Sequence, residues 1–113
     1  MSSLFADIVL EQLGGRSTLD TMLGIKSLTA SEATKTLTIK FKAKGREGIN
    51  TIVIRLDPSD TYTVEFWDIK VSPKNLRVLK VDTVSDVYAD VLVDVCESRT
   101  GLALRIPKVV FPR

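Results

Sequence analysis

Apolar and polar side chains alternate most regularly in residues 35–44, KTLTIKFKAK. Successive side chains of a strand point to opposite faces, so this stretch predicts a strand with one apolar face and one face of threonines and lysines. The same period of two recurs in residues 50–56 and 61–69, and two turn-forming sequences, KGREG and DPSD, separate the three stretches. We therefore expect three consecutive strands joined by short turns.

Two further alternating stretches extend this pattern in both directions. Residues 22–28 predict a first strand, in which Gly24 is expected to weaken the pairing or to mark a bulge. Residues 76–81 predict a short fifth strand, which follows the turn sequence SPKN and forms a hairpin with the fourth strand. Residues 16–21 have no clear period, and we expect a connection there.

The two ends of the chain have helical spacing instead. Residues 3–13 predict an amphipathic helix, which Ser2 or Ser3 can cap and which ends at the glycine pair 14–15. A closing helix is expected to begin with Ser85 as its cap and to end at Thr100-Gly101. We expect its apolar stripe to consist of Tyr88, Val91, Leu92 and Val95.

Four acidic side chains recur at helical spacing beside that stripe. They are Asp86, Asp90, Asp94 and Glu97. A run of this kind is typical of the solvated face of a helix, and a cation site or an acid–base pair is the less favoured alternative. Residues 103–113 contain two prolines and many apolar side chains, so we expect an extended tail that covers a sheet face, pairs with a sheet edge or crosses to another subunit.

These elements together predict an α+β fold in a single domain that spans residues 1–113. It consists of an N-terminal helix, an antiparallel meander of four to five strands, and a C-terminal helix with the extended tail. A chain of 113 residues is long enough for one core. Two amphipathic helices are expected to cover one face of the sheet and to leave the face that carries the lysines exposed to water.

The amino-acid composition excludes several classes of catalytic and metal site. The chain has no histidine and one cysteine, Cys96, so we expect no internal disulfide, no transition-metal site and no histidine-based triad. We predict a protein that is not an enzyme and needs no cofactor or metal, with Cys96 as a buried structural thiol. A single cysteine favours an intracellular setting, and the chain has neither an apolar run of about 18 residues nor a basic leader, so we expect no membrane span and no secretory signal.

Several short phrases together resemble a family of small phage and prophage proteins that is functionally unassigned. They are LGGR at 13–16, GIKSL at 24–28, TLTIKFKAKGREGIN at 36–50, DTYTVEF at 60–66, VYADVL at 87–92 and TGL at 100–102. The chain departs from the family pattern at Ser17 and Leu23. The resemblance implies a phage or prophage origin, a location in the host cytoplasm and an α–β–α layout, and it supplies no catalytic residues. The expected architecture is also similar to single-strand-binding modules of the PC4 and Whirly type, which is an analogy of fold alone.

The row of lysines on the second strand gives the leading functional hypothesis. The net charge is only +2, so an anionic partner must be attracted by local clustering. We expect a nucleic acid, with single-stranded DNA favoured, to bind the open sheet face by electrostatics and aromatic stacking. The residues expected to bind it are Lys26, Lys40, Lys42, Lys44, Arg46, Arg55 and Trp67.

Two alternatives to this hypothesis remain open at this point. The lysines and threonines can simply keep a half-exposed sheet soluble and discourage edge pairing, and Trp67 can be packed beneath the tail. The protein can instead be an interaction module that engages a host or phage protein through the same face or through residues 103–113, with no nucleic-acid binding. A homo-oligomer is expected in either case, because the tail and the sheet edges need cover.

Overall fold

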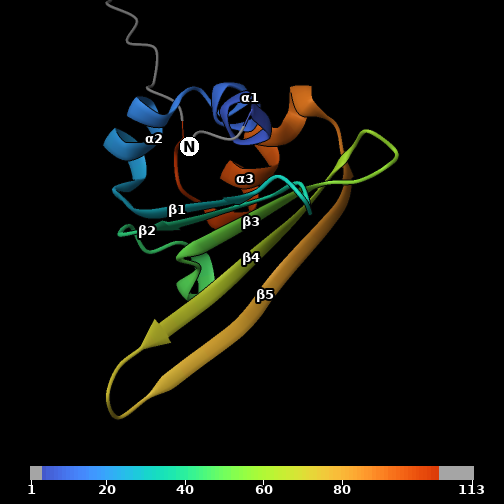
Figure 1. Cartoon of the computed structure of the whole chain (residues 1–113). Helices are drawn as coiled ribbons and strands as arrows, with labels where there is room; N and C mark the ends of the chain where they lie inside the picture. The colour runs from blue at the N-terminus through green and yellow to red at the C-terminus, as the bar shows by residue number, and fades with distance from the viewer. Residues whose placement is uncertain (1–3, 105–113) are drawn as a thin grey trace, which may run out of the picture.

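A five-stranded antiparallel sheet with the strand order β1-β2-β3-β4-β5 organises the part of the chain that the structure describes, residues 4–104. In this computed structural model the strands are β1 (Ile25–Ser31), β2 (Thr36–Phe41), β3 (Thr51–Leu56), β4 (Tyr62–Val71) and β5 (Leu76–Val87). The helices are α1 (Leu4–Gln12), α2 (Arg16–Leu23) and α3 (Leu92–Thr100), with short 3-10 turns η1 (Arg46–Gly48) and η2 (Ala89–Val91). The predicted α+β meander is confirmed (Figure 1).

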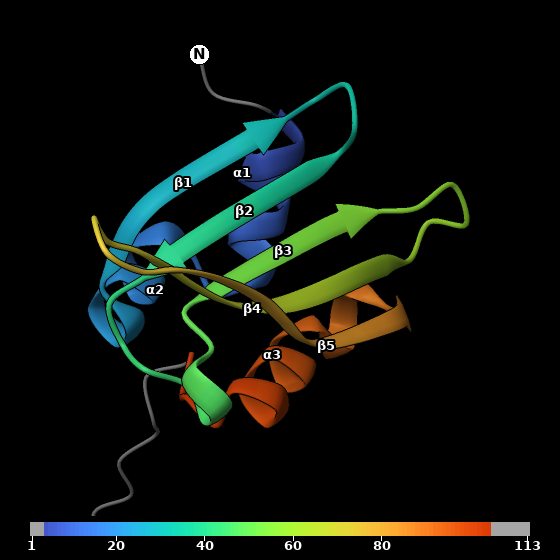
Figure 2. The ribbon, with the colours of Figure 1, turned by 90° about the horizontal axis from the view of Figure 1, so that it is seen from below.

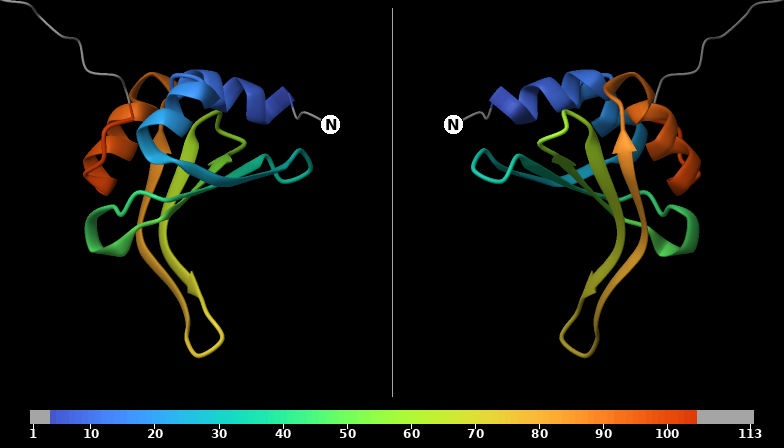
Figure 3. Two further views of the ribbon diagram at one scale, coloured as in Figure 1. Left: turned by 90° about the vertical axis from the view of Figure 1, so that its left-hand side faces the viewer. Right: turned by 90° about the vertical axis from the view of Figure 1, so that its right-hand side faces the viewer.

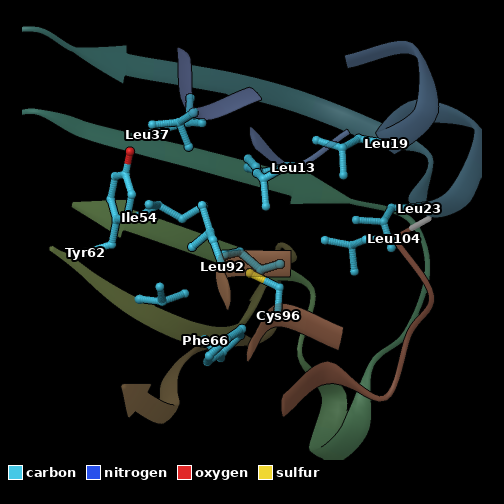
Figure 4. Close-up of a cluster of buried hydrophobic side chains, with 14 of the residues drawn as sticks. Leu13, Leu19, Leu23, Leu37, Ile54, Tyr62, Phe66, Leu92, Cys96 and Leu104 are labelled. Atoms are coloured by element: carbon cyan, nitrogen blue, oxygen red, sulfur yellow. The ribbon is translucent and has the colours of Figure 1, made fainter. Parts of the chain in front are cut away.

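The helices lie on one face of the sheet, as expected (Figure 2). The side chains that alternate toward this face are buried: Leu37, Ile39, Phe41, Ile52, Ile54, Tyr62, Val64 and Phe66. Complete burial of one such aliphatic or aromatic side chain contributes about 1.5–3 kcal/mol, so this face is the main source of stability. Figure 4 shows the core that they form with Leu13, Leu19, Leu23, Leu92 and Cys96 from the helical layer.

One polar contact crosses this core. The Tyr62 hydroxyl on β4 donates to Gln12 Oε1 at the end of α1 over 2.8 Å. Burial raises the pKa of Tyr62, and the hydrogen bond to Gln12 acts in the opposite direction. The contact satisfies a phenol that would otherwise be buried without a partner.

Residues 16–21 form most of helix α2, so the expected connection there is wrong. Leu19 and Leu23 are buried at a spacing of four residues. Residues 16–21 contain only the first of this pair, so their helical spacing is not visible in that stretch alone. Gly24 ends the helix in the left-handed conformation (φ 72°), and its N–H donates to the Asp20 carbonyl. Met22 and Leu23 therefore belong to α2, and the first strand begins at Ile25.

Two other helix boundaries match the glycine signals. Gly14 donates to the Glu11 carbonyl and Gly15 to the Leu10 carbonyl, the paired bonds of a Schellman motif at the end of α1. Gly101 has φ 72° and donates to the Glu97 carbonyl, which ends α3 where Thr100-Gly101 predicted it. The proposed caps Ser2 and Ser3 lie outside the described residues.

The closing helix starts later than the sequence predicts. Ser85 is part of β5, which continues to Val87, and α3 begins only at Leu92. β5 extends this far because Val84 pairs with Val64 and Val87 with Tyr62, so its apolar side chains complete the sheet. The predicted stripe is therefore wrong at two of its members: Tyr88 and Val91 are exposed. Asp86 and Asp90 likewise precede α3, so the four acids do not share one helical face.

The start of the tail returns to the core. Leu104 is buried, and its N–H donates to Glu97 Oε2 over 2.9 Å. Residues 105–113, the rest of the predicted tail, lie outside the described part of the chain. Among residues 4–104, no helix is both long and apolar enough to cross a membrane.

A two-stranded arm projects from the sheet on the side away from the helices (Figures 1 and 3). The last backbone pair between β3 and β4 joins Thr51 to Trp67, whereas β4 and β5 remain paired to Val71 and Leu76. We call residues 68–80 the arm. Val81 is an extra residue of β5 between the pairs Phe66–Asp82 and Trp67–Lys80, and such a bulge increases the local twist where the arm begins.

Burial makes a prediction for Cys96. Desolvation raises the pKa of this thiol from 9.0 to about 12. The thiolate is the reactive form, so the native protein should not react with a disulfide reagent at pH 8, and one thiol should appear when the chain is unfolded in denaturant. Rapid reaction of the native protein would contradict the burial of this side chain.

The same shift predicts a pH dependence of stability. Between pH 9 and about pH 12 the unfolded chain loses the Cys96 proton while the folded chain retains it, so the folded state loses stability as the pH rises above 9, by about 1.4 kcal/mol per unit. Lysines and tyrosines also titrate there, and Cys96→Ala is the matched control. Denaturant unfolding at pH 7.5 and pH 10 should give a larger loss for wild type than for the variant; equal losses would contradict the assignment.

Candidate nucleic-acid interface

A hollow of about 470 Å³ lies at the foot of the arm, between the ends of β1 and β2 on one side and β4 and β5 on the other. Five cationic side chains line it: Lys26, Lys42, Lys44, Lys70 and Arg77. Asp68 is its only acidic lining residue among those described. We call this surface the basic groove. A second hollow of about 210 Å³ adds Lys40 and shares five lining residues with it: Lys26, Phe41, Asn50, Ile69 and Val71.

Two walls face each other across the basic groove: the first carries Lys26, Lys42 and Lys44 from the ends of β1 and β2, and the second belongs to the arm. Backbone geometry fixes the lysines of the first wall. The Lys42 N–H donates to the Gly24 carbonyl over 2.7 Å, and the Ala43 N–H donates to the Leu23 carbonyl over 3.0 Å. A β-carbon at Gly24 would lie 3.3 Å from Lys42 Cβ, so the glycine leaves room for the lysine stem. Lys26 is the extra residue of a bulge between the pairs Ile25–Phe41 and Ser27–Lys40, and bulges commonly redirect a side chain.

The Asn50 side chain determines where β3 ends and the arm begins. Its Nδ2 donates to the Ile69 carbonyl over 2.7 Å, and its Oδ1 accepts the Ile69 N–H over 3.0 Å. The carboxamide thus replaces the backbone of a further β3 residue. This contact holds β4 at the floor of the basic groove, from which Lys70 extends the second wall.

Asp68 neutralises one cation of the groove and supports its base. The carboxylate is nearly buried and accepts from Arg77 Nη1 over 3.3 Å. Its Oδ2 would lie 2.9 Å from a β-carbon at Gly48, whose φ is 83°, so only glycine fits there. Within residues 4–104, no acidic group lies within ion-pair distance of Lys26, Lys42, Lys44 or Lys70. The groove therefore keeps a strong positive potential despite the low net charge of the chain.

The open face of the sheet is less basic than the sequence predicts. Its central row consists of Lys40, Thr51, Trp67 and Lys80 on adjacent strands. Thr51 is buried because its short side chain lies between Lys40 and Trp67. Since neighbouring strands are about 4.8 Å apart, Lys40 and Trp67 are separated by about 10 Å.

Trp67 lies on this open face, as alternation predicts, but its ring already has partners. Lys80 Nζ lies 5.7 Å from the ring centroid, and Trp67 Nε1 donates to Glu65 Oε1 over 3.2 Å. Lys80 also pairs with Glu65 over 3.6 Å. A base that stacks on the Lys80 side of the ring must displace that ammonium group, which costs about 0.5–1 kcal/mol at an exposed site.

Two of the residues expected to bind nucleic acid lie away from the groove. Arg55 is at the opposite end of β3 and pairs with Asp57 over 3.3 Å. The Thr63 hydroxyl, which donates to Asp57, is the main cause that holds the pKa of that carboxyl below its usual value; burial opposes it, and Arg55 adds to the lowering. Arg46 lies in η1, and its guanidinium is near Gly101 at the C-terminus of α3, where a positive charge is favourable.

The groove thus brings together three of the predicted lysines, Lys26, Lys42 and Lys44, with Lys40 at its rim. Sequence reasoning missed Lys70 and Arg77. A signal for them existed, because a hairpin around the turn 72–75 places these two residues opposite each other. Among residues 4–104, no group of three or more Asp, Glu, Cys or His side chains could hold a metal ion.

The Asn50 contact makes a prediction for the root of the arm. Asn50→Ala removes both side-chain bonds to Ile69, and each hydrogen bond removed from a partly buried site costs about 0.5–1.5 kcal/mol. We expect lower stability in denaturant unfolding and faster hydrogen exchange at the Ile69 amide. Asn50→Asp is the matched control, since it retains the acceptor for the Ile69 N–H and should protect that amide better. Equal exchange in wild type and Asn50→Ala would show that the side chain does not hold the arm.

Comparison with known proteins adds no relative. No family model, no curated protein and no solved structure matches the chain. The phage or prophage origin that the sequence phrases imply stays a prediction. A functional assignment therefore depends on the residues and geometry of the basic groove and the arm.

Proposed function

We propose that this protein is a non-enzymatic nucleic-acid-binding protein that holds single-stranded DNA in the basic groove. The observation that supports this most is the convergence of Lys26, Lys42, Lys44, Lys70 and Arg77, from three separate segments, around one hollow. A solvated strand would carry a similar number of lysines, but it would not require cations from different strands to face one another. Such a cluster suits the repeated charges of a phosphate backbone.

The lining of the groove favours unpaired nucleotides over a duplex. Ile69 and Val71 contribute apolar surface beside the cations. An unstacked base can contact such surface while its phosphate meets a lysine, whereas a duplex presents mainly phosphates and sugars to a protein that does not enter its grooves. Recognition of this kind has little sequence preference.

The residues have different roles in this proposal. Lys26, Lys42 and Lys44 neutralise phosphates on one wall, Lys70 does so on the other, and Lys40 extends the path onto the open face. Arg77 contributes a charge that Asp68 already partly neutralises. A base that stacks on the Lys80 side of the Trp67 ring would displace Lys80, and Arg46 and Arg55 would act as distant charges.

The proposal is tested with a fluorescent single-stranded oligonucleotide in an anisotropy titration. The variant Lys42→Ala/Lys44→Ala should bind at least about tenfold more weakly than wild type. It neutralises fewer phosphates, and the affinity at low salt decreases with each phosphate contact that is lost. The logarithmic salt slope should also decrease by about 0.7 for each phosphate that the variant no longer neutralises. A duplex of the same sequence should bind more weakly than the single strand.

A charge-matched control separates position from net charge. Lys35→Ala/Arg55→Ala removes the same two charges from the opposite end of the sheet, where both side chains already have acidic partners. Its affinity should stay within about twofold of wild type, since exposed charges beyond a Debye length are screened. Equal losses of affinity in the two variants, or no binding of wild type below about 100 μM at low salt, would contradict the proposal.

The alternative of a protein-interaction module has an observation of its own. The arm exposes apolar side chains at its end, including Val71 and Leu76. Val71 also lines the basic groove, but Leu76 does not, and an exposed apolar surface of this kind favours a protein partner over a nucleic acid.

A further inference from the structure

The end of the arm has no cover within the described chain. Val71 and Leu76, which pair across the hairpin, are 75% and 73% exposed. Val78 and Leu79 are also more than half exposed. Isolated apolar side chains on a surface are ordinary, but Val71, Leu76 and Val78 lie on one side of this narrow ribbon and form a contiguous patch typical of an interaction site.

The other exposed apolar side chains lie on the helical layer. Among residues 4–104, the large hydrophobic side chains that are strongly exposed and do not belong to the arm are Leu4, Ile8, Tyr88 and Val91. They come from α1 and from the segment around η2, which lie together: Glu11 and Leu13 line an open hollow of about 560 Å³ with Ala89 and Asp90. Figure 3 shows these elements at the end of the molecule opposite the arm.

The arm and the helical layer carry charges of opposite sign. Helix α1 and residues 86–94 together hold five acidic residues and no lysine or arginine. The arm has the opposite sign, with Lys70, Lys74, Arg77 and Lys80 against Asp68 alone. We call the exposed surface of α1 and residues 86–94 the acidic helical face. Each surface thus combines apolar side chains with charges of a single sign, and the two signs are complementary.

We propose that the arm of one molecule docks on the acidic helical face of a second copy of this chain. The apolar side chains of the arm would cover those of α1 and η2, while Lys74 in the turn of the arm meets acids such as Glu11 and Asp90. An arm-to-arm contact would bury similar apolar surface but would bring cations of like sign together. The two surfaces lie at opposite ends of the molecule, so the contact is head-to-tail and leads to a ring or an open chain of subunits.

This assembly does not depend on nucleic-acid binding. Register places Ile69, Val71, Leu76 and Val78 on one side of the ribbon and Lys70 and Arg77 on the other. Ile69 and Val71 also line the basic groove, whereas Leu76 and Val78 do not, so one arm can present Leu76 and Val78 to a neighbouring subunit and Lys70 and Arg77 to the groove. Variants of Leu76 and Val78 retain every lysine, so the oligonucleotide titration and the assembly experiment can fail independently.

The test is sedimentation velocity of the full chain at increasing concentration. Wild type should sediment above the 12.5 kDa of one chain at about 100 μM, and high salt should shift it toward the monomer. The arm variant Leu76→Ser/Val78→Ser and the face variant Glu11→Lys/Asp90→Lys should each be monomeric. All four side chains are exposed, and far-UV circular dichroism checks that both variants fold.

Mixing the two variants distinguishes a head-to-tail contact from other arrangements. The face variant retains an intact arm and the arm variant an intact face, so an equimolar mixture should form a heterodimer of about 25 kDa, twice the mass of one chain, and nothing larger. A wild type that stays monomeric at about 100 μM would overturn the proposal. So would a face variant that assembles like wild type, or a mixture that remains monomeric. If the double face variant does not fold, Glu11→Lys alone takes its place in the same mixture.

Discussion

Burial of one face of β2, β3 and β4 beneath the helical layer is the constraint on which the rest of the molecule depends. Because side chains alternate along each strand, burial of Leu37, Ile39 and Phe41 commits Lys40 and the threonines to the opposite face. A slip of one residue would exchange the two sets, so the register is strongly specified. The cations at the end of β2 are therefore held by the core, although none of them contributes to it.

The arm is the part of the sheet that extends beyond this cover. β3 stops at Thr51, and the Asn50 carboxamide completes the pairing with Ile69, after which only β4 and β5 continue. Because no third strand or helix among residues 4–104 covers it, the ribbon keeps its apolar side chains exposed, and Lys70 and Arg77 line the groove with the lysines at the end of β2. The groove and the proposed subunit contact are two consequences of this one geometric feature.

The strands that follow strict alternation were predictable from the sequence, because a period of two over six or more residues has one satisfactory arrangement on a half-buried sheet. Helix α2 was not, since its eight residues contain only two buried side chains and its polar residues conceal the spacing. The extent of β5 was also missed, because SDVY at 85–88 has both a helix-capping serine and a strand period, and the pairing of Val84 and Val87 with β4 decides between them. The cluster of cations depended on the same long-range pairing. Lys42 and Lys44 follow from local pattern, whereas Lys70 and Arg77 join them only when the hairpin register is known.

The most direct test of the basic groove is a two-dimensional amide NMR titration of the full chain with a short single-stranded oligonucleotide. We expect the largest shifts at Lys26, Lys42, Lys44 and Lys70, with small changes at Lys35 and Arg55 at the other end of the sheet. Shifts centred on Thr38 and Val53 of the open face, or no shifts at low salt, would show that the groove does not bind the strand.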